Sequence, residues 1–193
     1  MPVADRLGRI VLLLLLFAAW QLGEGKYLQA KAWLAQQLLR TAWQQTRDGG
    51  DRIAPWPWAD TWPVARLEVP RLGIDQIVLA DTSGRTLAFG PGHLNGSAPL
   101  GEAGNSVLSG HRDTHFSFLR ELKRDDLLHL TLPDRRRIRY RVYDLGVVDA
   151  RVGVSIQRQQ RELTLTTCYP FDALLPGGSE RYLVAARPVE LRF

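Results

Sequence analysis

The chain has 193 residues, of which 45% are hydrophobic, and a formal net charge of +5. This length suits one domain with a sizeable core plus an appendage, and it is short for two complete domains. Residues 54–193 are close to neutral, which argues against nucleic-acid binding, since binding domains of that kind usually carry a clear basic excess. The single cysteine, Cys168, excludes an intramolecular disulfide.

An uninterrupted apolar run, Ile10 to Trp20, follows Arg6 and Arg9 near the N-terminus. The run is short for a membrane span, which takes about 20 residues, and a cleaved signal peptide has the same basic and apolar layout. The first small-x-small cleavage pattern, Ala30-Lys31-Ala32, does not follow the run closely. We therefore interpret residues 1–25 as an uncleaved signal anchor, with a cleaved signal peptide as the alternative. The two arginines predict that the chain after the anchor lies outside the cytoplasm.

Residues 26–61 are predicted to connect this anchor to a folded domain. The segment from Lys26 to Arg47 is rich in Ala, Leu and Gln and predicts an amphipathic helix with an apolar stripe at a spacing of four: Ala30, Leu34, Leu38 and Ala42. The sequence DGGD at 48–51 ends it. Three tryptophans and three prolines at 54–63 then exclude a regular helix or a central strand. We interpret them as a strap pinned to the domain by its indoles, with the lining of a binding groove as the alternative.

From residue 62 to residue 193, short β-branched runs alternate with Gly, Pro, Asn and Asp. This texture predicts seven or eight strands in an antiparallel barrel or sandwich, with one helical insertion at 114–122. The basic run DRRRIRYR at 134–141 alternates arginines with Ile138 and Tyr140. That spacing favours a strand with one solvated face over a nucleic-acid or anionic-lipid patch.

Cys168 ends the apolar run of the segment TLTTCYPF, residues 164–171. A free cysteine at such a place is either a small core residue or a nucleophile, and a nucleophile needs a base elsewhere in the chain. His93 and His111 each follow a glycine at a predicted loop, where rigid scaffolds present functional groups. His129 alternates with leucines and is interpreted as a strand residue without a chemical role.

The residue pattern gives little support for a metal or a cofactor. His111 and His115 share a spacing of four, but across a predicted loop rather than on a helix. The acidic residues Glu68, Asp75 and Glu102 are dispersed, and no phosphate-binding loop is present in the sequence. We expect no metal dependence and no cofactor.

Three motifs together resemble the sortase family. TLTTC at 164–168 is similar to the sortase motif TLxTC, SGHRDTHF at 109–116 looks like the segment that carries the sortase histidine, and Arg181 follows at the position of the sortase arginine. The resemblance covers residues 62–193 and implies an eight-stranded β-barrel preceded by the anchor helix and the amphipathic helix. The tryptophan strap and the short apolar N-terminus further resemble the Gram-negative, marine proteobacterial branch, class GN.

The resemblance implies a cysteine transpeptidase, a thiol enzyme of the cysteine peptidase type. Such an enzyme cleaves an LPxTG-like sorting signal of an exported protein and transfers the acyl group to an amine acceptor. It implies a catalytic set of Cys168, His111 and Arg181. Weaker candidates for substrate or oxyanion contacts, or for holding the histidine loop, are Thr167, His93 and Asp113.

The same resemblance predicts the partners and the location. The partners are the exported protein, an unidentified amine and the membrane, with no nucleic acid. The location is the inner membrane in a single pass, with the catalytic domain in the periplasm. Two other functions stay open at this point: a cysteine peptidase that releases its substrate by hydrolysis, and an inactive membrane-tethered β-barrel that binds a partner.

Overall fold

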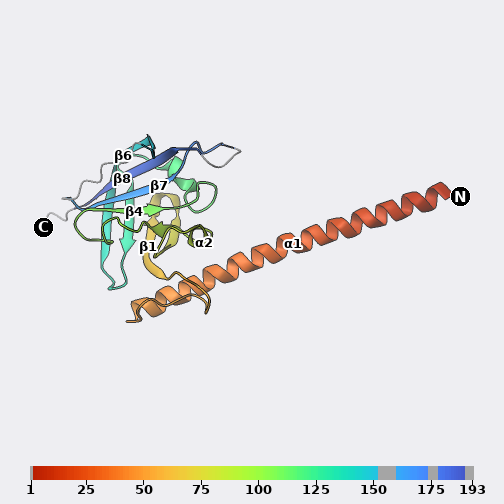
Figure 1. The fold of residues 1–193 in the computed structure, drawn as a ribbon, viewed down its shortest axis with the longest axis horizontal. Helices are drawn as coiled ribbons and strands as arrows, with labels where there is room; N and C mark the ends of the chain where they lie inside the picture. Colours follow the sequence, from red (N-terminus) through yellow and green to blue (C-terminus); the bar gives the residue numbers. More distant parts are fainter. Residues whose placement is uncertain (1, 152–159, 174–177, 190–193) are drawn as a thin grey trace. The chain divides into compact units, whose positions relative to one another are not determined.

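The computed structural model describes residues 2–151, 160–173 and 178–189. The chain forms two compact units, Met1–Gln37 and Leu38–Phe193, and each is described by itself. The helix α1 (Pro2–Arg47) begins in the first unit and ends in the second. Figure 1 shows it in red to orange.

The first unit is a single helical segment that continues through Gly23 and Gly25, so no break separates the predicted anchor from the predicted amphipathic helix. The apolar side chains that are described from Ile10 to Trp20 are exposed. The helix from Gly8 onward is long and apolar enough to cross a membrane, with a mean hydropathy of 1.3 in its most apolar stretch. Length, composition and exposure are consistent with a membrane anchor.

The last turns of α1 belong to the second unit and pack against strand β2 (Ile74–Leu79). The contact is a small apolar cluster: Leu39, Trp43, Ile77 and Leu79, with Trp56 and Phe89 at its edge. Of the predicted stripe, Ala42 is buried and Leu38 is half-buried, whereas Leu34 in the first unit is 52% exposed. The part of the stripe in the second unit is therefore enclosed together with Leu39 and Trp43.

The tryptophan and proline segment has no helix or strand between residues 51 and 62, as its composition predicts. Trp56 packs edge-on against Phe89 with 4.7 Å between ring centroids, and Arg52 lies over the ring of Trp62. Trp58 is 83% exposed. The strap is thus held to the domain on the side of β2, and not by all of its indoles.

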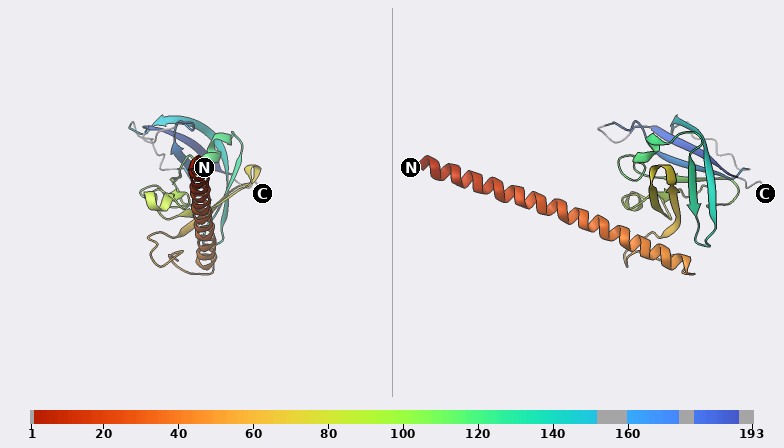
Figure 2. Two further views of the ribbon diagram at one scale, coloured as in Figure 1. Left: turned by 90° about the vertical axis from the view of Figure 1, so that its right-hand side faces the viewer. Right: turned by 180° about the vertical axis from the view of Figure 1, so that it is seen from behind.

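Eight strands close into a barrel in the order β1-β2-β3-β4-β7-β8-β6-β5 (Figures 1 and 2). Besides β2, they are β1 (Pro63–Val69), β3 (Gly92–His93), β4 (Asn105–Ser109), β5 (Leu127–Thr131), β6 (Arg137–Asp149), β7 (Glu162–Cys168) and β8 (Glu180–Pro188). The short helices are η1 (Pro70–Leu72), α2 (Gly84–Leu87) and η2 (Ser117–Glu121). The predicted eight-stranded barrel is confirmed, and the predicted helical insertion is the 3₁₀ helix η2. The expectation of a wholly antiparallel arrangement is wrong, because β2 pairs with β3 and β4 pairs with β7 in parallel.

Side chains alternate between the barrel interior and its outer face, as the period of two in a strand requires. In β7, Leu163 and Leu165 are fully buried in the core. In β6, Arg137, Arg139 and Arg141 are exposed while Tyr140 is fully buried. The basic run is therefore a solvated strand face, as predicted.

Candidate active site

The site is built at the ends of two parallel strands. β4 and β7 run parallel, with Ser109 paired to Thr166, and the Gly110 N–H donates to the Thr166 carbonyl at 3.2 Å. Continuing this register by two residues brings His111 level with Cys168. A parallel pair needs a long crossover between its strands. Here that crossover carries η2, β5 and β6, and His111 stands at its start.

Cys168 lies on the outer face of the barrel. Its neighbour Thr167 points inward and is 2% exposed, whereas Cys168 is exposed. Alternation along the strand produces this difference, because Thr167 continues the inward series of Leu163 and Leu165. A core role for Cys168 is therefore excluded.

Arg181 is paired directly with Cys168 across the antiparallel strands β7 and β8. One guanidinium nitrogen, Nη1, donates to the carbonyls of Gly178 and Glu180 at 2.7 and 2.8 Å. Nε and Nη2 have no hydrogen-bond partner in the part of the chain that the structure describes. The residue is half-buried, and among the described residues these two nitrogens are left for a ligand beside the thiol.

A pocket of ≈ 240 Å³ lies beside Arg181 on the outer face of the barrel. Its lining is mostly apolar or hydroxyl-bearing: Leu94, Asn105, Val107, Val148, Ala150, Thr164, Thr166, Arg181 and Leu183. Thr164 and Thr166 are on the same face of β7 as Cys168. Small side chains on this floor leave room for an extended chain that leads to the thiol.

His115 stands near His111 and differs from it in burial. Burial lowers the pKa of His115, a contact with the Ala88 backbone acts in the opposite direction, and charge repulsion from His111 lowers the pKa further. His111 itself is exposed. His115 is half-buried, so His111 is the more exposed imidazole of this loop.

The weaker candidates have other partners in this structure. The Thr167 hydroxyl donates to the Gly110 carbonyl at 2.7 Å on the inner face, away from the face of Cys168. His93 Nε2 lies 3.0 Å from both the Ala98 carbonyl and the Ser97 hydroxyl, so its ring ties together a turn. The Asp113 carboxylate is 69% exposed, and its one partner among the described residues is the Nε of Arg112, at 3.3 Å.

Arg112 is a buried residue of the site whose role the sequence does not reveal. It is 7% exposed, and its guanidinium donates to the carbonyls of Pro170 and Ala173, each at 2.7 Å. These carbonyls belong to the loop after Cys168, whereas Arg112 itself follows His111. The side chain thus ties the two loops together. The only sequence signal was its position next to a candidate histidine, in the segment SGHRD.

No group of three or more His, Cys, Asp or Glu side chains is placed to hold a metal ion within residues 2–151, 160–173 and 178–189. The expectation of a metal-independent enzyme stays a prediction.

An exposed cysteine thus stands opposite an arginine on one rim of a closed β-barrel. A family model described as the sortase domain matches residues 67–189, and the chain belongs to the sortase family. It is 34% identical over 125 residues to Sortase D of Bacillus subtilis (strain 168), covering 64% of this chain and 62% of that protein.

Solved structures agree with this assignment. Sortase A from Corynebacterium diphtheriae matches with a TM-score of 0.60 and 29% identity, covering 69% of this chain and 64% of that one. Sortase C-1 from Actinomyces oris matches with a TM-score of 0.59 and 29% identity, covering 67% of this chain and 74% of that one. The chain thus spans less than two thirds of the length of the Sortase D and the Sortase A.

The two bonds from Arg112 predict a loss of both stability and activity on substitution. Arg112→Lys keeps the charge but cannot serve both carbonyls with a planar fork, and a buried carbonyl without a donor costs about 1–3 kcal/mol. We expect the free energy of unfolding in urea to fall by about that amount, and kcat/KM for a peptide substrate to fall with it.

Arg136→Lys is the matched control, because Arg136 is exposed and pairs only with Asp134 nearby in sequence. It should leave both quantities unchanged. Wild-type stability in Arg112→Lys would show that the two loops are held by other contacts.

Proposed function

We propose that the protein is a sortase-type cysteine transpeptidase in which Cys168 is the nucleophile, His111 the acid and base, and Arg181 the donor to substrate carbonyls. The observation that carries this proposal is the register of three adjacent strands. It aligns Cys168 with Arg181 and, two residues beyond the last β4–β7 pair, with His111. Membership of the sortase family supports it.

In the first half of the reaction, the thiolate of Cys168 attacks the scissile carbonyl, because the thiolate and not the thiol is the nucleophile. Negative charge moves to the carbonyl oxygen, where the free donors of Arg181 stabilise it. The C–N bond then breaks as the His111 imidazolium gives its proton to the departing amine. The products are a thioester on Cys168 and a neutral imidazole.

In the second half, an incoming amine attacks the thioester carbonyl and loses a proton to the His111 imidazole. The C–S bond breaks, the thiolate leaves, and a new amide bond joins the acyl group to the acceptor. The thiolate and imidazolium are thereby restored. No redox step is involved.

The substrate in this proposal is an exported protein with an LPxTG-like signal, cleaved between Thr and Gly. The apolar helix anchors the enzyme in the inner membrane in a single pass, and the barrel faces the periplasm. This places residues 1–25 in the anchor, 26–61 in the connection and 62–193 in the catalytic domain. The helix and the tryptophan strap support an assignment to class GN.

Hydrolysis is the second candidate function, because the exposed thiol of Cys168 leaves the thioester open to water. A cysteine peptidase would use the same Cys168 and His111 but release a free acid. Adding a primary amine such as triglycine and measuring ligated against hydrolysed product by mass spectrometry separates the two. The exposure of Cys168 also disfavours an inactive binding module.

The nucleophile assignment predicts that Cys168→Ala folds normally and forms no acyl-enzyme. The change removes one exposed atom, so the free energy of unfolding should change by less than about 1 kcal/mol. Mass spectrometry after incubation with a sorting-signal peptide should show no mass increase, whereas the wild type gains the acyl mass. Substrate turnover by the alanine variant would exclude Cys168 as the nucleophile.

The role of Arg181 predicts a different sensitivity for two reactions. Arg181→Lys loses the planar pair of donors, so kcat/KM for peptide should fall by about 10²-fold or more. Alkylation of Cys168 by a small reagent should change much less, because no peptide carbonyl is held in that step.

Arg139→Lys on the exposed face of β6 is the control and should leave kcat/KM for peptide and the alkylation of Cys168 unchanged. Near-normal peptide turnover by Arg181→Lys would make the arginine structural and leave Cys168 and His111 as the proposed catalytic residues.

The proposed orientation predicts that protease added to spheroplasts of a Gram-negative host digests the barrel. Arg6 and Arg9 keep the N-terminus in the cytoplasm, so the anchored domain should be accessible from outside, whereas a cytoplasmic marker stays intact. Protection of the barrel would reverse the orientation. A mature N-terminus near residue 33 would show a cleaved signal peptide in place of an anchor.

A further inference from the structure

The floor of the groove continues well beyond the pocket beside Arg181. Strands β4, β7 and β8 place their outward side chains in successive rows across the barrel surface, following the register of the strand pairs. Each row has one residue from β4 or the segment that follows it, one from β7 and one from β8. Counted from the thiol end, the first row is His111, Cys168 and Arg181. The second row is Ser109, Thr166 and Leu183, and the third is Val107, Thr164 and Ala185. The fourth row is Asn105, Glu162 and Arg187, where Asn105 and Glu162 are paired in register and Arg187 meets Glu162 through an ion pair.

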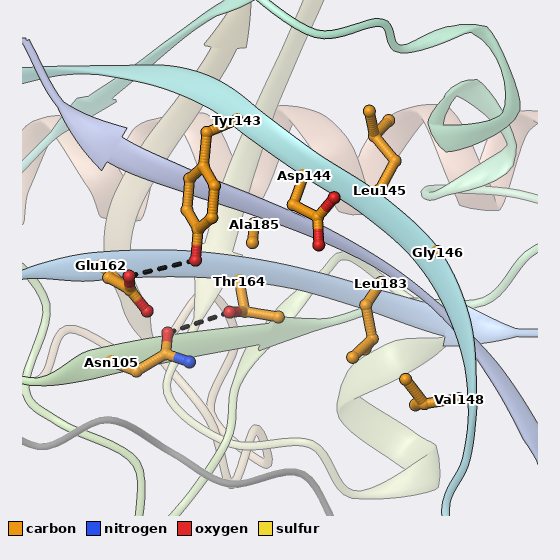
Figure 3. Close-up of a pocket in the computed structure, with 10 residues that line it drawn as sticks. All are labelled: Asn105, Tyr143, Asp144, Leu145, Gly146, Val148, Glu162, Thr164, Leu183 and Ala185. Atoms are coloured by element: carbon orange, nitrogen blue, oxygen red, sulfur yellow. Dashed lines mark hydrogen bonds between the residues drawn. The ribbon is translucent and has the colours of Figure 1, made fainter.

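A second pocket, of ≈ 260 Å³, opens at this fourth row (Figure 3). It shares Asn105, Val148, Thr164 and Leu183 with the pocket beside Arg181, so the two form one continuous groove. Figure 3 shows Glu162 and Asn105 at one end of this pocket and Leu183 and Val148 at the other. The groove is therefore apolar toward the thiol and polar at its far end.

The polar end is a built site rather than a loose surface cluster. Asn105 and Glu162 are each 5% exposed, and Thr164 is 6% exposed. Glu162 Oε1 accepts from the Tyr143 hydroxyl at 3.1 Å and from Arg187 Nε at 3.0 Å. Asn105 Oδ1 accepts from the Thr164 hydroxyl at 3.0 Å. Burial and the Glu162 carboxylate raise the pKa of Tyr143, which keeps that hydroxyl protonated as a donor.

Each of these two pocket-lining residues has a second polar atom. The second carboxylate oxygen of Glu162, Oε2, and the side-chain nitrogen of Asn105, Nδ2, make no hydrogen bond to the residues that the structure describes, and both residues line the pocket. One acceptor and one donor on directly paired residues match the N–H and C=O groups of a peptide main chain.

The spacing of the rows shows which part of a substrate would reach this point. Glu162 is six residues from Cys168 along β7, or about 20 Å at roughly 3.3 Å per residue. An extended substrate advances by a similar distance per residue, so a four-residue LPxT motif covers only about 13 Å. The fourth row then meets the substrate about six residues from the scissile bond, which is outside the motif.

We propose that Asn105 and Glu162 bind the main chain of the substrate segment that precedes the sorting motif. Glu162 Oε2 accepts a hydrogen bond from a peptide N–H, and Asn105 Nδ2 donates one to a peptide carbonyl. This inference rests on the proposed transpeptidase function and names a part of the substrate that the motif does not include. Because the contacts are to the main chain, they depend on the length of the segment more than on its side chains.

The order of the reaction indicates that the groove binds the substrate segment before the motif and not the segment after it. The acyl part of the substrate stays on the enzyme as a thioester, whereas the amine part leaves and is replaced by the acceptor. A long groove that ends at Cys168 suits the part that stays.

The test compares kcat/KM for two peptides in the full-length protein: LPETG alone, and LPETG preceded by six alternating Ser and Ala residues. In the wild type we expect the longer peptide to react about tenfold better, the factor of a hydrogen bond to a charged group. Glu162→Gln keeps an acceptor for Tyr143 and Arg187 but replaces Oε2 with a donor. In this variant the ratio between the two peptides should fall to about two or less.

Glu68→Gln is the matched control, because Glu68 is a carboxylate of β1 that pairs with Arg137 away from the groove. It should keep the full tenfold ratio. If Glu162→Gln does not fold, as judged by thermal unfolding, Asn105→Ser removes the donor instead and should lower the ratio in the same way. Equal values for the two peptides in the wild type, or a tenfold ratio retained in folded Glu162→Gln or Asn105→Ser, would overturn the proposal.

Two further outcomes separate this proposal from the proposed function. If residues added after the motif raise kcat/KM and residues added before it do not, the subsite is refuted while the transpeptidase function stands. If the wild type acts on neither peptide and forms no thioester, the proposed function fails on this motif and the subsite fails with it.

Discussion

The parallel pairing of β4 with β7 is the constraint on which the rest of the site depends. Parallel strands point their ends the same way, so residues that follow them meet at one rim of the barrel. Ser109 and Thr166 set the register, and a slip of one residue would turn Cys168 inward and Thr167 outward. The inner series of Leu163 and Leu165, fully buried, opposes such a slip. Core packing therefore decides which side chain faces the groove.

The pairing alone does not fix the loops that follow the two strands, and other contacts complete the rim. Arg112 crosses from the loop after His111 to two carbonyls of the loop after Cys168. Tyr169 and Phe171, directly beyond the cysteine, pack with Tyr182 of β8 at 6.2 and 5.2 Å between ring centroids. A buried cation and an aromatic cluster thus hold the segment after the thiol from two sides. The preorganisation of the site comes from these contacts as much as from the strands.

Much of this arrangement can be predicted from the sequence, because it follows periodicity. Alternation in RRIRYRVYD predicts a strand with exposed arginines and a buried Tyr140, and the structure has both. Proline and tryptophan at 54–63 predict irregular structure, which is present. The motifs around His111, Cys168 and Arg181 predict that these residues share a site. The register pairs Cys168 with Arg181, and the shared site with His111 stays a prediction.

The remainder depends on long-range pairing that no local pattern reports. The stripe from Ala30 to Ala42 does not include Leu39 and Trp43, which make the contact with β2 beside the buried Ala42. The Thr167 hydroxyl is adjacent to the cysteine in sequence, yet strand alternation sends it to the Gly110 carbonyl. Arg112 and Glu162 read as ordinary charged residues until the fold buries them.

The distribution of charge along the groove follows from the same ladder of strands. Ionisable side chains stand in the first row, with Cys168 and Arg181, and in the fourth, with Glu162 and Arg187. The two rows between them hold only neutral side chains on β4, β7 and β8. The carboxylate of Asp144 on β6, which is paired in register with Ala185 of the third row, also lines the pocket and makes an ion pair with Arg124. A groove of this form suits a short motif of mainly uncharged residues, with main-chain contacts at the fourth row to hold the chain that leads into it.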